Sequence, residues 1–246
     1  MRFLTWIRGL KSEPATEFVE PVGCVAIILD GNARWASGKG LPVAEGHREG
    51  TRALRRTVEA AIDLGVRALV VYAFSTENWT RPPDEVDSLM EIFSETIQRE
   101  LPDLAKQGVR VRFLGRSDRA PHDLREQMAD LEAHTGTNDR LDLWIAFDYG
   151  GRAELADAAK KLIQAGIPPE EIDEDTFARA LYEPDLPDPD LLIRTAGDQR
   201  ISNFLLWQLA YAELVFVETL WPDFGAADLR SALSEYASRE RRYGGR

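Results

Sequence analysis

Residues 25–35 read VAIILDGNARW, and this stretch decides the fold more than any other part of the chain. Its first five residues are all apolar, which is typical of a strand buried on both faces of a parallel sheet. The strand ends at Asp30, Gly31 and Asn32, because glycine permits a sharp turn and asparagine tolerates unusual backbone angles. Open α/β sheets bind their ligands at the carboxyl ends of such strands. The stretch therefore predicts that Asp30 lies at a ligand-binding edge of the sheet.

Similar apolar runs recur along the chain and alternate with helical patterns. The runs that predict strands are Val25–Leu29, Ala68–Tyr72, Val109–Leu114, Leu141–Phe147, Leu191–Ile193 and Leu214–Val217. Apolar residues at helical spacing lie around residues 54–62, 86–97, 155–162 and 229–236. This alternation predicts an α/β fold, a single domain with a mostly parallel six-stranded sheet and helices on both faces. We expect that domain to cover residues 21–246, after an N-terminal segment of residues 1–20.

Composition narrows the classes of partner. The chain has 246 residues, a net charge of −12 and a pI of about 4.8, so we expect no nucleic-acid partner. The single cysteine, Cys24, excludes an internal disulfide and favours a reducing, cytoplasmic location. No apolar run reaches the ~20 residues that a membrane-spanning helix needs, and no secretion signal is evident. Residues 3–10 mix apolar and basic side chains, which suits a peripheral membrane contact or, as we favour, a helix docked on its own domain.

Three predicted strands end in polar clusters. The first joins Asp30 to Arg34 and Trp35; a helix cap or a turn is the alternative role for the acid, and its two neighbours favour function. The others read YAFSTENWTRP over residues 72–82 and LIRTAGDQRISN over residues 192–203. Their arginines suit a diphosphate, because a guanidinium forms bidentate, charge-assisted hydrogen bonds. The alternative is that each arginine forms a surface ion pair, which is the more common role of a single arginine. Three such loops facing one crevice of an acidic protein favour a binding site.

Cations around a carboxylate fit Mg²⁺ with a diphosphate. Mg²⁺ typically takes one or two protein carboxylates and completes its shell with phosphate oxygens and water, and Asp30 is the candidate ligand. The helices that follow these loops are rich in large apolar residues, so an apolar tail has a path between them and the sheet. The alternative is that these apolar residues only pack the helices against the core, which would produce the same helical spacing. His47 suits either an anion or a helix cap.

Together these motifs closely resemble the cis-prenyltransferase family, whose bacterial members include the undecaprenyl diphosphate synthases. The resemblance runs from Val22 to Gly245. The matching stretches are residues 27–36, 46–47, 72–82, 149–152, 193–195, 200–208, 212–214 and 221–224. Their order along nearly the whole chain makes the resemblance highly specific.

The resemblance implies a fold, a reaction and a cofactor. It implies an α/β homodimer with an apolar tunnel that uses Mg²⁺ to condense isopentenyl diphosphate with an allylic diphosphate, such as farnesyl or geranyl diphosphate. Each new double bond takes the Z configuration. The small side chain of Ala73 favours a medium or long polyprenyl product, whereas the bulk of Trp144 and Phe147 leaves a short-chain product as the alternative.

The resemblance also implies roles for individual residues. Asp30 matches the residue that holds Mg²⁺ and the diphosphate, Asn78 the proton acceptor and Glu213 a second metal-site acid. The matching substrate-binding residues are Gly31, Asn32, Ala33, Arg34 and His47 for the allylic diphosphate, Trp35 and Trp79 for the hydrocarbon parts, Ser75, Thr76 and Glu77 beside the relay, and Arg81, Arg194, Arg200, Ile201 and Ser202 for isopentenyl diphosphate. Residues 242–244 resemble an Arg-x-Gly motif that reaches the partner subunit's site.

Four residues depart from the family pattern. Ala33 replaces a glycine, Val43 an arginine, Gln199 a histidine and Asp148 an asparagine. The methyl group of Ala33 crowds the phosphate loop, and Val43 removes one cation. We therefore expect weaker binding of one diphosphate with activity retained.

Three other classes of protein are weighed against this interpretation. A non-catalytic polyprenyl-diphosphate-binding subunit would typically lack the acid and the Asn-Trp pair, which this chain retains at Asp30, Asn78 and Trp79. A phosphatase of the haloacid dehalogenase kind needs a second aspartate where Asn32 stands. The helical trans-prenyltransferases use Asp-Asp-x-x-Asp segments, and the sequence contains none.

Overall fold

The computed structural model describes residues 22–99 and 101–239. The N-terminal segment that the sequence predicts, residues 1–20, lies outside this range, and so does the Arg-x-Gly motif at residues 242–244. The strands are β1 (Cys24–Ile28), β2 (Ala68–Ser75), β3 (Val109–Leu114), β4 (Leu141–Tyr149), β5 (Leu191–Arg194) and β6 (Glu213–Phe216). The helices are α1 (Asn32–Gly38), α2 (Val43–Asp63), α3 (Pro83–Arg99), α4 (Leu101–Lys106), α5 (His122–Thr135), α6 (Gly151–Gln164), α7 (Glu174–Ala178) and α8 (Ala226–Ser238), with 3₁₀ turns η1 (Thr76–Thr80), η2 (Pro169–Glu171) and η3 (Trp221–Asp223).

The six strands form one sheet in the order β3-β4-β2-β1-β5-β6, and every neighbouring pair is parallel. The predicted single α/β domain with a six-stranded sheet is confirmed. β1 lies between β2 and β5 because its residues are apolar on both sides and all five are buried. β2 and β4 run two or three residues beyond the predicted strands, since Phe74 and Tyr149 continue the buried pattern.

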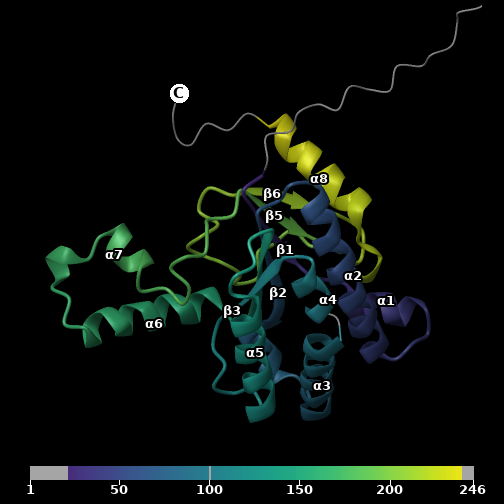
Figure 1. Cartoon of the computed structure of the whole chain (residues 1–246), viewed down its shortest axis with the longest axis horizontal. Helices are drawn as coiled ribbons and strands as arrows, with labels where there is room; N and C mark the ends of the chain where they lie inside the picture. Colours follow the sequence, from purple (N-terminus) through teal and green to yellow (C-terminus); the bar gives the residue numbers. More distant parts are fainter. Residues whose placement is uncertain (1–21, 100, 240–246) are drawn as a thin grey trace, which may run out of the picture.

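The two faces of the sheet are covered differently. Helices α2, α3, α5 and α8 pack on the face that carries Val25 and Ile27 (Figure 1). On the other face, the irregular chain on either side of β5, residues 182–190 and 195–212, takes the place that we expected helices to fill. It buries Phe204, which stacks on Tyr72 with ring centroids 4.4 Å apart, together with Leu205 and Leu209. Large apolar side chains on an irregular segment therefore supply this half of the core.

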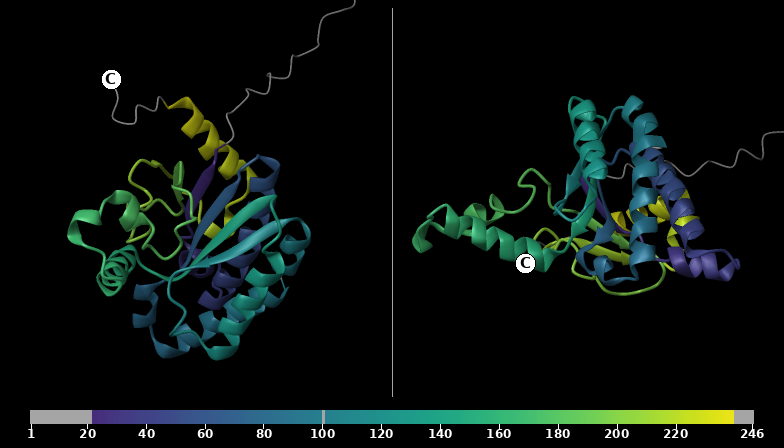
Figure 2. Two further views of the ribbon diagram at one scale, coloured as in Figure 1. Left: turned by 60° about the vertical axis from the view of Figure 1, so that its left-hand side comes forward. Right: turned by 90° about the horizontal axis from the view of Figure 1, so that it is seen from below.

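Helices α6 and α7 extend away from the sheet as an arm (Figure 2). Their own small cluster, Ala158, Leu162, Ala180 and Leu181, holds the arm together, and Ile163 remains largely exposed on it. Among the helices that the structure describes, none has the length and apolar character that crossing a membrane requires.

The predicted ligand-binding edge lies where three neighbouring strands end. Asp30 comes two residues after β1, η1 follows β2 directly, and Arg194 is the last residue of β5. Because β2, β1 and β5 are adjacent and parallel, their carboxyl ends bring the three polar clusters of the sequence to one edge.

Candidate active site

The turn after β1 holds Asp30 in place. Gly31 has a φ of 110°, and a Cβ there would lie 3.0 Å from Leu220 Cδ2 and 3.1 Å from Ala196 Cβ, so the turn needs glycine. The amide of Asp30 donates to Thr195 Oγ1 at 2.9 Å, and its carbonyl accepts from the amide of Trp221 at 2.9 Å. The backbone is fixed on both sides, and the carboxylate faces the open edge.

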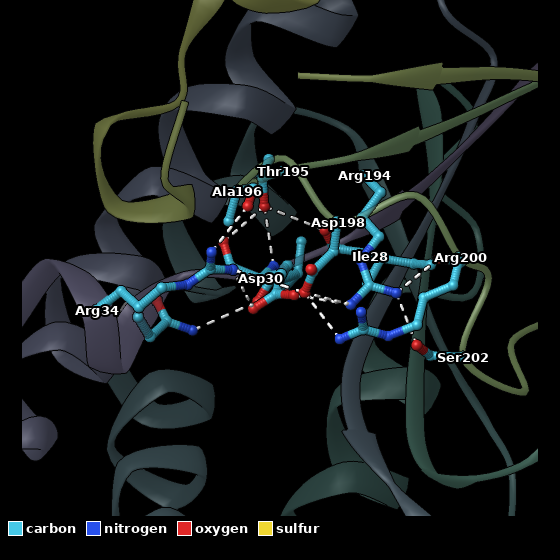
Figure 3. Close-up of polar contacts among 11 residues, drawn as sticks. Ile28, Asp30, Arg34, Arg194, Thr195, Ala196, Asp198, Arg200 and Ser202 are labelled. Atoms are coloured by element: carbon cyan, nitrogen blue, oxygen red, sulfur yellow. Dashed lines mark hydrogen bonds and ion pairs between the residues drawn. The ribbon is translucent and has the colours of Figure 1, made fainter. Parts of the chain in front are cut away.

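Two carboxylates and three guanidinium groups meet at this edge (Figure 3). Arg194 lies 2.8 Å from Asp30 and 3.3 Å from Asp198, and its side chain is buried. Arg34 lies 3.3 Å from Asp30, and Arg200 lies 2.7 Å from Asp198. The structure thus brings together Asp30, Arg34, Arg194 and Arg200, as the sequence predicts.

Sequence reasoning missed Asp198. It is the one acid in the polar loop of residues 192–203, and that signal was available. The Arg200 guanidinium holds the pKa of Asp198 below its usual range. Asp198 therefore stays charged and gathers the arginines around Asp30.

The loop that follows β5 has an unusual backbone. Three residues of this loop have φ values in the left-handed region, which residues other than glycine rarely adopt. They are Ala196 at 70°, Ser202 at 47° and Asn203 at 65°. Asn203 donates to Glu77 Oε1 at 2.8 Å and accepts from the amide of Arg152 at 2.9 Å, which ties the loop to η1 and α6. Such strain tends to persist at functional sites, where the surroundings hold it.

η1 begins with a capping box between Ser75 and Asn78. The amide of Ser75 donates to Asn78 Oδ1 at 2.8 Å, so the amide nitrogen of Asn78 is the atom left for a ligand. Arg81 ends this turn and lies 2.7 Å from Glu85 at the start of α3. The second cluster thus offers hydrogen-bond donors and one cation to the edge.

His47 lies in the second turn of α2, beneath α1. A Cβ at Gly46 would lie 2.2 Å from the carbonyl oxygen of Asn32, so the two helices make close backbone contact. Burial, reinforced by Arg81, lowers the pKa of His47 to about 4, which leaves the imidazole neutral near pH 7. Pro42 is the N-cap of α2, so the alternative of a capping role for His47 is wrong.

Two buried polar atoms beside the turn have no hydrogen-bond partner within residues 22–99 and 101–239. They are Asn32 Oδ1 and His47 Nε2. Buried polar atoms are nearly always hydrogen-bonded, so these two atoms have bonding capacity left for a water molecule or a polar ligand.

A cavity of about 270 Å³ runs from this polar mouth into the protein. Asp30, Arg34 and His47 line the mouth, and apolar side chains of α2, α3 and the sheet line the interior, including Leu54, Leu89, Phe93, Phe113 and Ile145. Leu141 and Leu143 of β4 are buried in the core and do not line this cavity.

A second pocket of about 520 Å³ opens beside the first. Its polar lining comes from Asp30, Ser75, Glu77, Asn78, Arg81, Arg194, Ser202 and Asn203. Asp30, Asn78 and Arg81 belong to both pockets. Two ligands that occupied the pockets would therefore meet at these three residues.

Six predicted site residues line neither pocket; they are Trp35, Thr76, Trp79, Arg200, Ile201 and Glu213. Trp35 donates to Asp223 at 2.8 Å, Lys39 covers its ring, and it lines neither pocket. Trp79 packs behind η1 against Phe74. Glu213 pairs with Leu191, level with the amino half of β1, which puts it ~16 Å along the strands from Asp30.

A family profile described as "Putative undecaprenyl diphosphate synthase" matches residues 28–244. The chain belongs to the cis-prenyltransferase family. Among its relatives, a ditrans,polycis-undecaprenyl-diphosphate synthase of Xanthomonas axonopodis pv. citri is 52% identical over 224 residues, 89% of this chain and 87% of the relative. An isoprenyl transferase of Thermotoga maritima is 48% identical over 223 residues, 90% of this chain and 96% of the relative.

A solved cis-prenyltransferase structure supports the same assignment. Lavandulyl diphosphate synthase from Lavandula x intermedia, crystallised with dimethylallyl diphosphate, matches with a TM-score of 0.87 and 37% identity, over 91% of this chain and 98% of that one. The phosphatase and the helical trans-prenyltransferase, which the sequence analysis weighed as alternatives, are therefore wrong.

The donor set of this cis-prenyltransferase suits a hard cation that shares its shell with a substrate. In the described part of the chain, no three His, Cys, Asp or Glu side chains gather as a metal cluster. Asp30 brings a carboxylate to the mouth of both pockets. Mg²⁺ needs only one or two protein carboxylates when phosphate oxygens and water supply the rest. These residues therefore fit Mg²⁺ with a diphosphate.

Proposed function

We propose that this cis-prenyltransferase condenses isopentenyl diphosphate with an allylic diphosphate, such as farnesyl or geranyl diphosphate. The product would be a Z-polyprenyl diphosphate of medium to long chain. One observation carries the proposal: Asp30 stands where a cavity with an apolar interior meets a polar, arginine-lined pocket. A diphosphate with a hydrocarbon tail fits the first pocket, and a small diphosphate fits the second.

The allylic substrate would place its diphosphate at the mouth of the first cavity. His47 Nε2 is buried there without a partner in the described chain and would donate to a phosphate oxygen, and Arg34 supplies a cation. The hydrocarbon would extend between α2 and α3. Apolar burial stabilises it by about 25 cal/mol for each Å² removed from water.

Isopentenyl diphosphate would bind in the second pocket. Arg81, Arg194 and Ser202 line it, and Arg200 is held beside it by Asp198. Arg194 Nη1 already donates to Ser202 Oγ at 2.6 Å, so both side chains are oriented before a ligand arrives. Guanidinium groups bind phosphate through bidentate hydrogen bonds, which suits this pocket for the diphosphate of the smaller substrate.

In the reaction, the allylic C–O bond breaks and diphosphate leaves with the electron pair. The alkene of isopentenyl diphosphate forms the new C–C bond, and a proton leaves the adjacent carbon. Arg34, which lines the first cavity, would stabilise the negative charge that develops on the leaving oxygen. Mg²⁺, when bound at Asp30, would supply further charge stabilisation. Because Asn78 Oδ1 is engaged by Ser75, we assign Asn78 to orienting a proton relay that ends on the departing diphosphate or on Asp30.

The sequence also predicts a metal role for Glu213, a cytoplasmic location and a peripheral membrane contact, and we retain these as proposals. A role for Glu213 at the metal would need a second subunit of the predicted homodimer, since within one chain it pairs with Arg239 at the other end of the strands. The cytoplasmic location rests on the lone, buried Cys24, and the peripheral membrane contact on the composition of residues 3–10.

A short-chain product is the second candidate, and the size of the cavity favours it. An engineered protein cavity of about 150 Å³ holds one benzene ring, whereas this cavity measures about 270 Å³. A long chain would therefore need α2 and α3 to move apart as it grows.

Product analysis tests both candidates. The full chain is incubated with Mg²⁺, labelled isopentenyl diphosphate and one of dimethylallyl, geranyl or farnesyl diphosphate, and the extracted products are examined by mass spectrometry. We expect a ladder of products that differ by one isoprene unit. Products that stop after one or two additions support the short-chain candidate, and a folded protein that elongates no primer would indicate the non-catalytic binding subunit.

A further inference from the structure

Asp148, near the end of β4, is fully buried. Arg119 pairs with both of its carboxylate oxygens; Nε lies 3.0 Å from Oδ2, and Nη2 contacts Oδ1. A buried carboxylate persists only when such a partner offsets its loss of water. Neither residue lines the two pockets, so the pair has no direct contact with substrate to explain it.

The loop that carries Arg119 is braced against the end of β4. A Cβ at Gly115 would lie 2.2 Å from the carbonyl oxygen of Phe147, so the loop passes very close to the strand. The amide of Arg116 donates to the carbonyl of Asp148 at 3.3 Å. Arg119 is therefore held both by its own backbone and by the buried carboxylate.

Arg119 presents its guanidinium to Trp79. The guanidinium carbon lies 5.1 Å from the centre of the indole ring, within the range of a cation–π contact. Phe74 meets the ring edge-on with centroids 5.0 Å apart. The buried Nε1 of Trp79 finds no acceptor among the residues that the structure describes. The position of this indole thus depends on packing against the core, including these two ring contacts, and not on a hydrogen bond.

Trp79 belongs to η1, the short turn that both pockets share. Asn78 precedes it, and Arg81 follows two residues later; both line both pockets. A shift of Trp79 would therefore move the groups that we assign to the proton relay and to isopentenyl diphosphate. Asn32, Arg34 and His47 lie on α1 and α2, outside η1, although Asn78 and Arg81 also reach the first cavity.

We propose that Asp148 and Arg119 are positioning residues that act through Trp79 to hold η1 in register with the isopentenyl diphosphate pocket. This inference rests on the proposed function. Its chain of contact is Asp148 to Arg119, Arg119 to the Trp79 ring, and Trp79 to its neighbours in η1.

Two conservative variants test the inference. Arg119→Lys keeps a cation for the buried Asp148 but loses the planar group over the indole. Asp148→Asn keeps the size and tolerates the φ of 46° at this position but removes the charge that fixes Arg119. We expect both to raise the KM for isopentenyl diphosphate and lower kcat, with a combined loss of about tenfold to a hundredfold in kcat/KM, as for a displaced catalytic group. The KM for the allylic substrate should rise less than the KM for isopentenyl diphosphate, since α1 and α2 keep their contacts and only Asn78 and Arg81 of η1 reach the first cavity.

A second arginine–aspartate pair supplies the matched control. Arg110 and Asp142 form a two-point contact at 2.5 and 2.6 Å, at the amino ends of β3 and β4 and away from both pockets. Asp142→Asn should lower thermal stability less than Asp148→Asn, because its ion pair is partly exposed, and should leave all three kinetic constants unchanged.

Amide hydrogen exchange on the ligand-free protein tests the contacts from Asp148 through Arg119 to Trp79 without a measurement of activity. Residues 75–82 should exchange faster in Arg119→Lys and Asp148→Asn than in the parent or in Asp142→Asn. If the parent elongates no primer, the proposed function fails and this exchange result still decides the inference. Folded variants with parental kinetics and parental exchange over residues 75–82 would overturn it, as would losses that fall equally on the allylic KM.

Discussion

At the scale of single residues, Asp30 matters most because two pockets and two arginines converge on it. Its contacts with Thr195 and Trp221 use backbone atoms, and Asp198 continues to pair with Arg194 when the carboxylate is removed. We therefore expect Asp30→Ala to fold normally and to lose at least about a thousandfold in turnover. Initial rates of labelled isopentenyl diphosphate incorporation, beside thermal unfolding, measure both effects. Activity within tenfold of the parent would contradict the assigned role.

His47 gives the site a pH dependence. Burial and Arg81 lower its pKa from about 6.5 to about 4 in the folded protein. Between pH 6.5 and pH 4 the imidazole of His47 is protonated in the unfolded chain but stays neutral in the folded protein. The free energy of unfolding therefore falls as the pH drops through this window. NMR titration of the imidazole should give a midpoint near 4, and a bound diphosphate should raise it. His47→Gln should lose this part of the acid sensitivity, and a midpoint near 6.5 would show that the side chain is not buried as described.

At the scale of elements, the contact between α1 and α2 fixes the allylic half of the site. In Gly46→Ala the new Cβ would need the place of the Asn32 carbonyl oxygen, 2.2 Å away, so α1 must shift together with Asn32 and Arg34. We expect the free energy of unfolding to fall by about 1–3 kcal/mol and the KM for the allylic substrate to rise.

Denaturant unfolding and initial-rate kinetics measure these two effects. Gly38→Ala is the matched control, because a Cβ at that end of α1 meets nothing within 4 Å. If Gly46→Ala and Gly38→Ala had the same free energy of unfolding and the same KM for the allylic substrate, the close contact of α1 with α2 would not be needed for stability or for binding.

The elements also show how far the sequence alone could lead. Apolar runs predicted all six strands, because a strand buried on both faces leaves a continuous hydrophobic signal. The same runs located the three strand ends that carry Asp30, Asn78 and Arg194. Local patterns could not show that residues 182–190 and 195–212 cover one face of the sheet, since that packing depends on contacts distant in sequence. For the same reason they could not place Trp79 behind η1 or Glu213 at the far end of the strands.

At the scale of the whole molecule, the cavity lies between the helical layer and the sheet. Phe93 on α3 lines it and meets Phe147 edge-on, with ring centroids 4.9 Å apart, so these rings bound the space for a growing chain. We expect Phe93→Ala to shift the product distribution to longer chains and to lower stability by ~3 kcal/mol, as for other large-to-small changes. Mass spectrometry of the products gives the distribution. An unchanged chain length would place the path of the hydrocarbon elsewhere.

The central claim is that one diphosphate binds beside Asp30 with a metal ion while its tail enters the apolar cavity. A crystal structure of the chain with Mg²⁺, isopentenyl diphosphate and an unreactive allylic thiodiphosphate tests it most directly. We predict a metal ion bound to Asp30 and to a phosphate oxygen, the hydrocarbon between α2 and α3, and the second diphosphate on Arg194 and Arg200. A complex in which Asp30 still pairs only with Arg34 and Arg194, with both substrates bound elsewhere, would contradict the account.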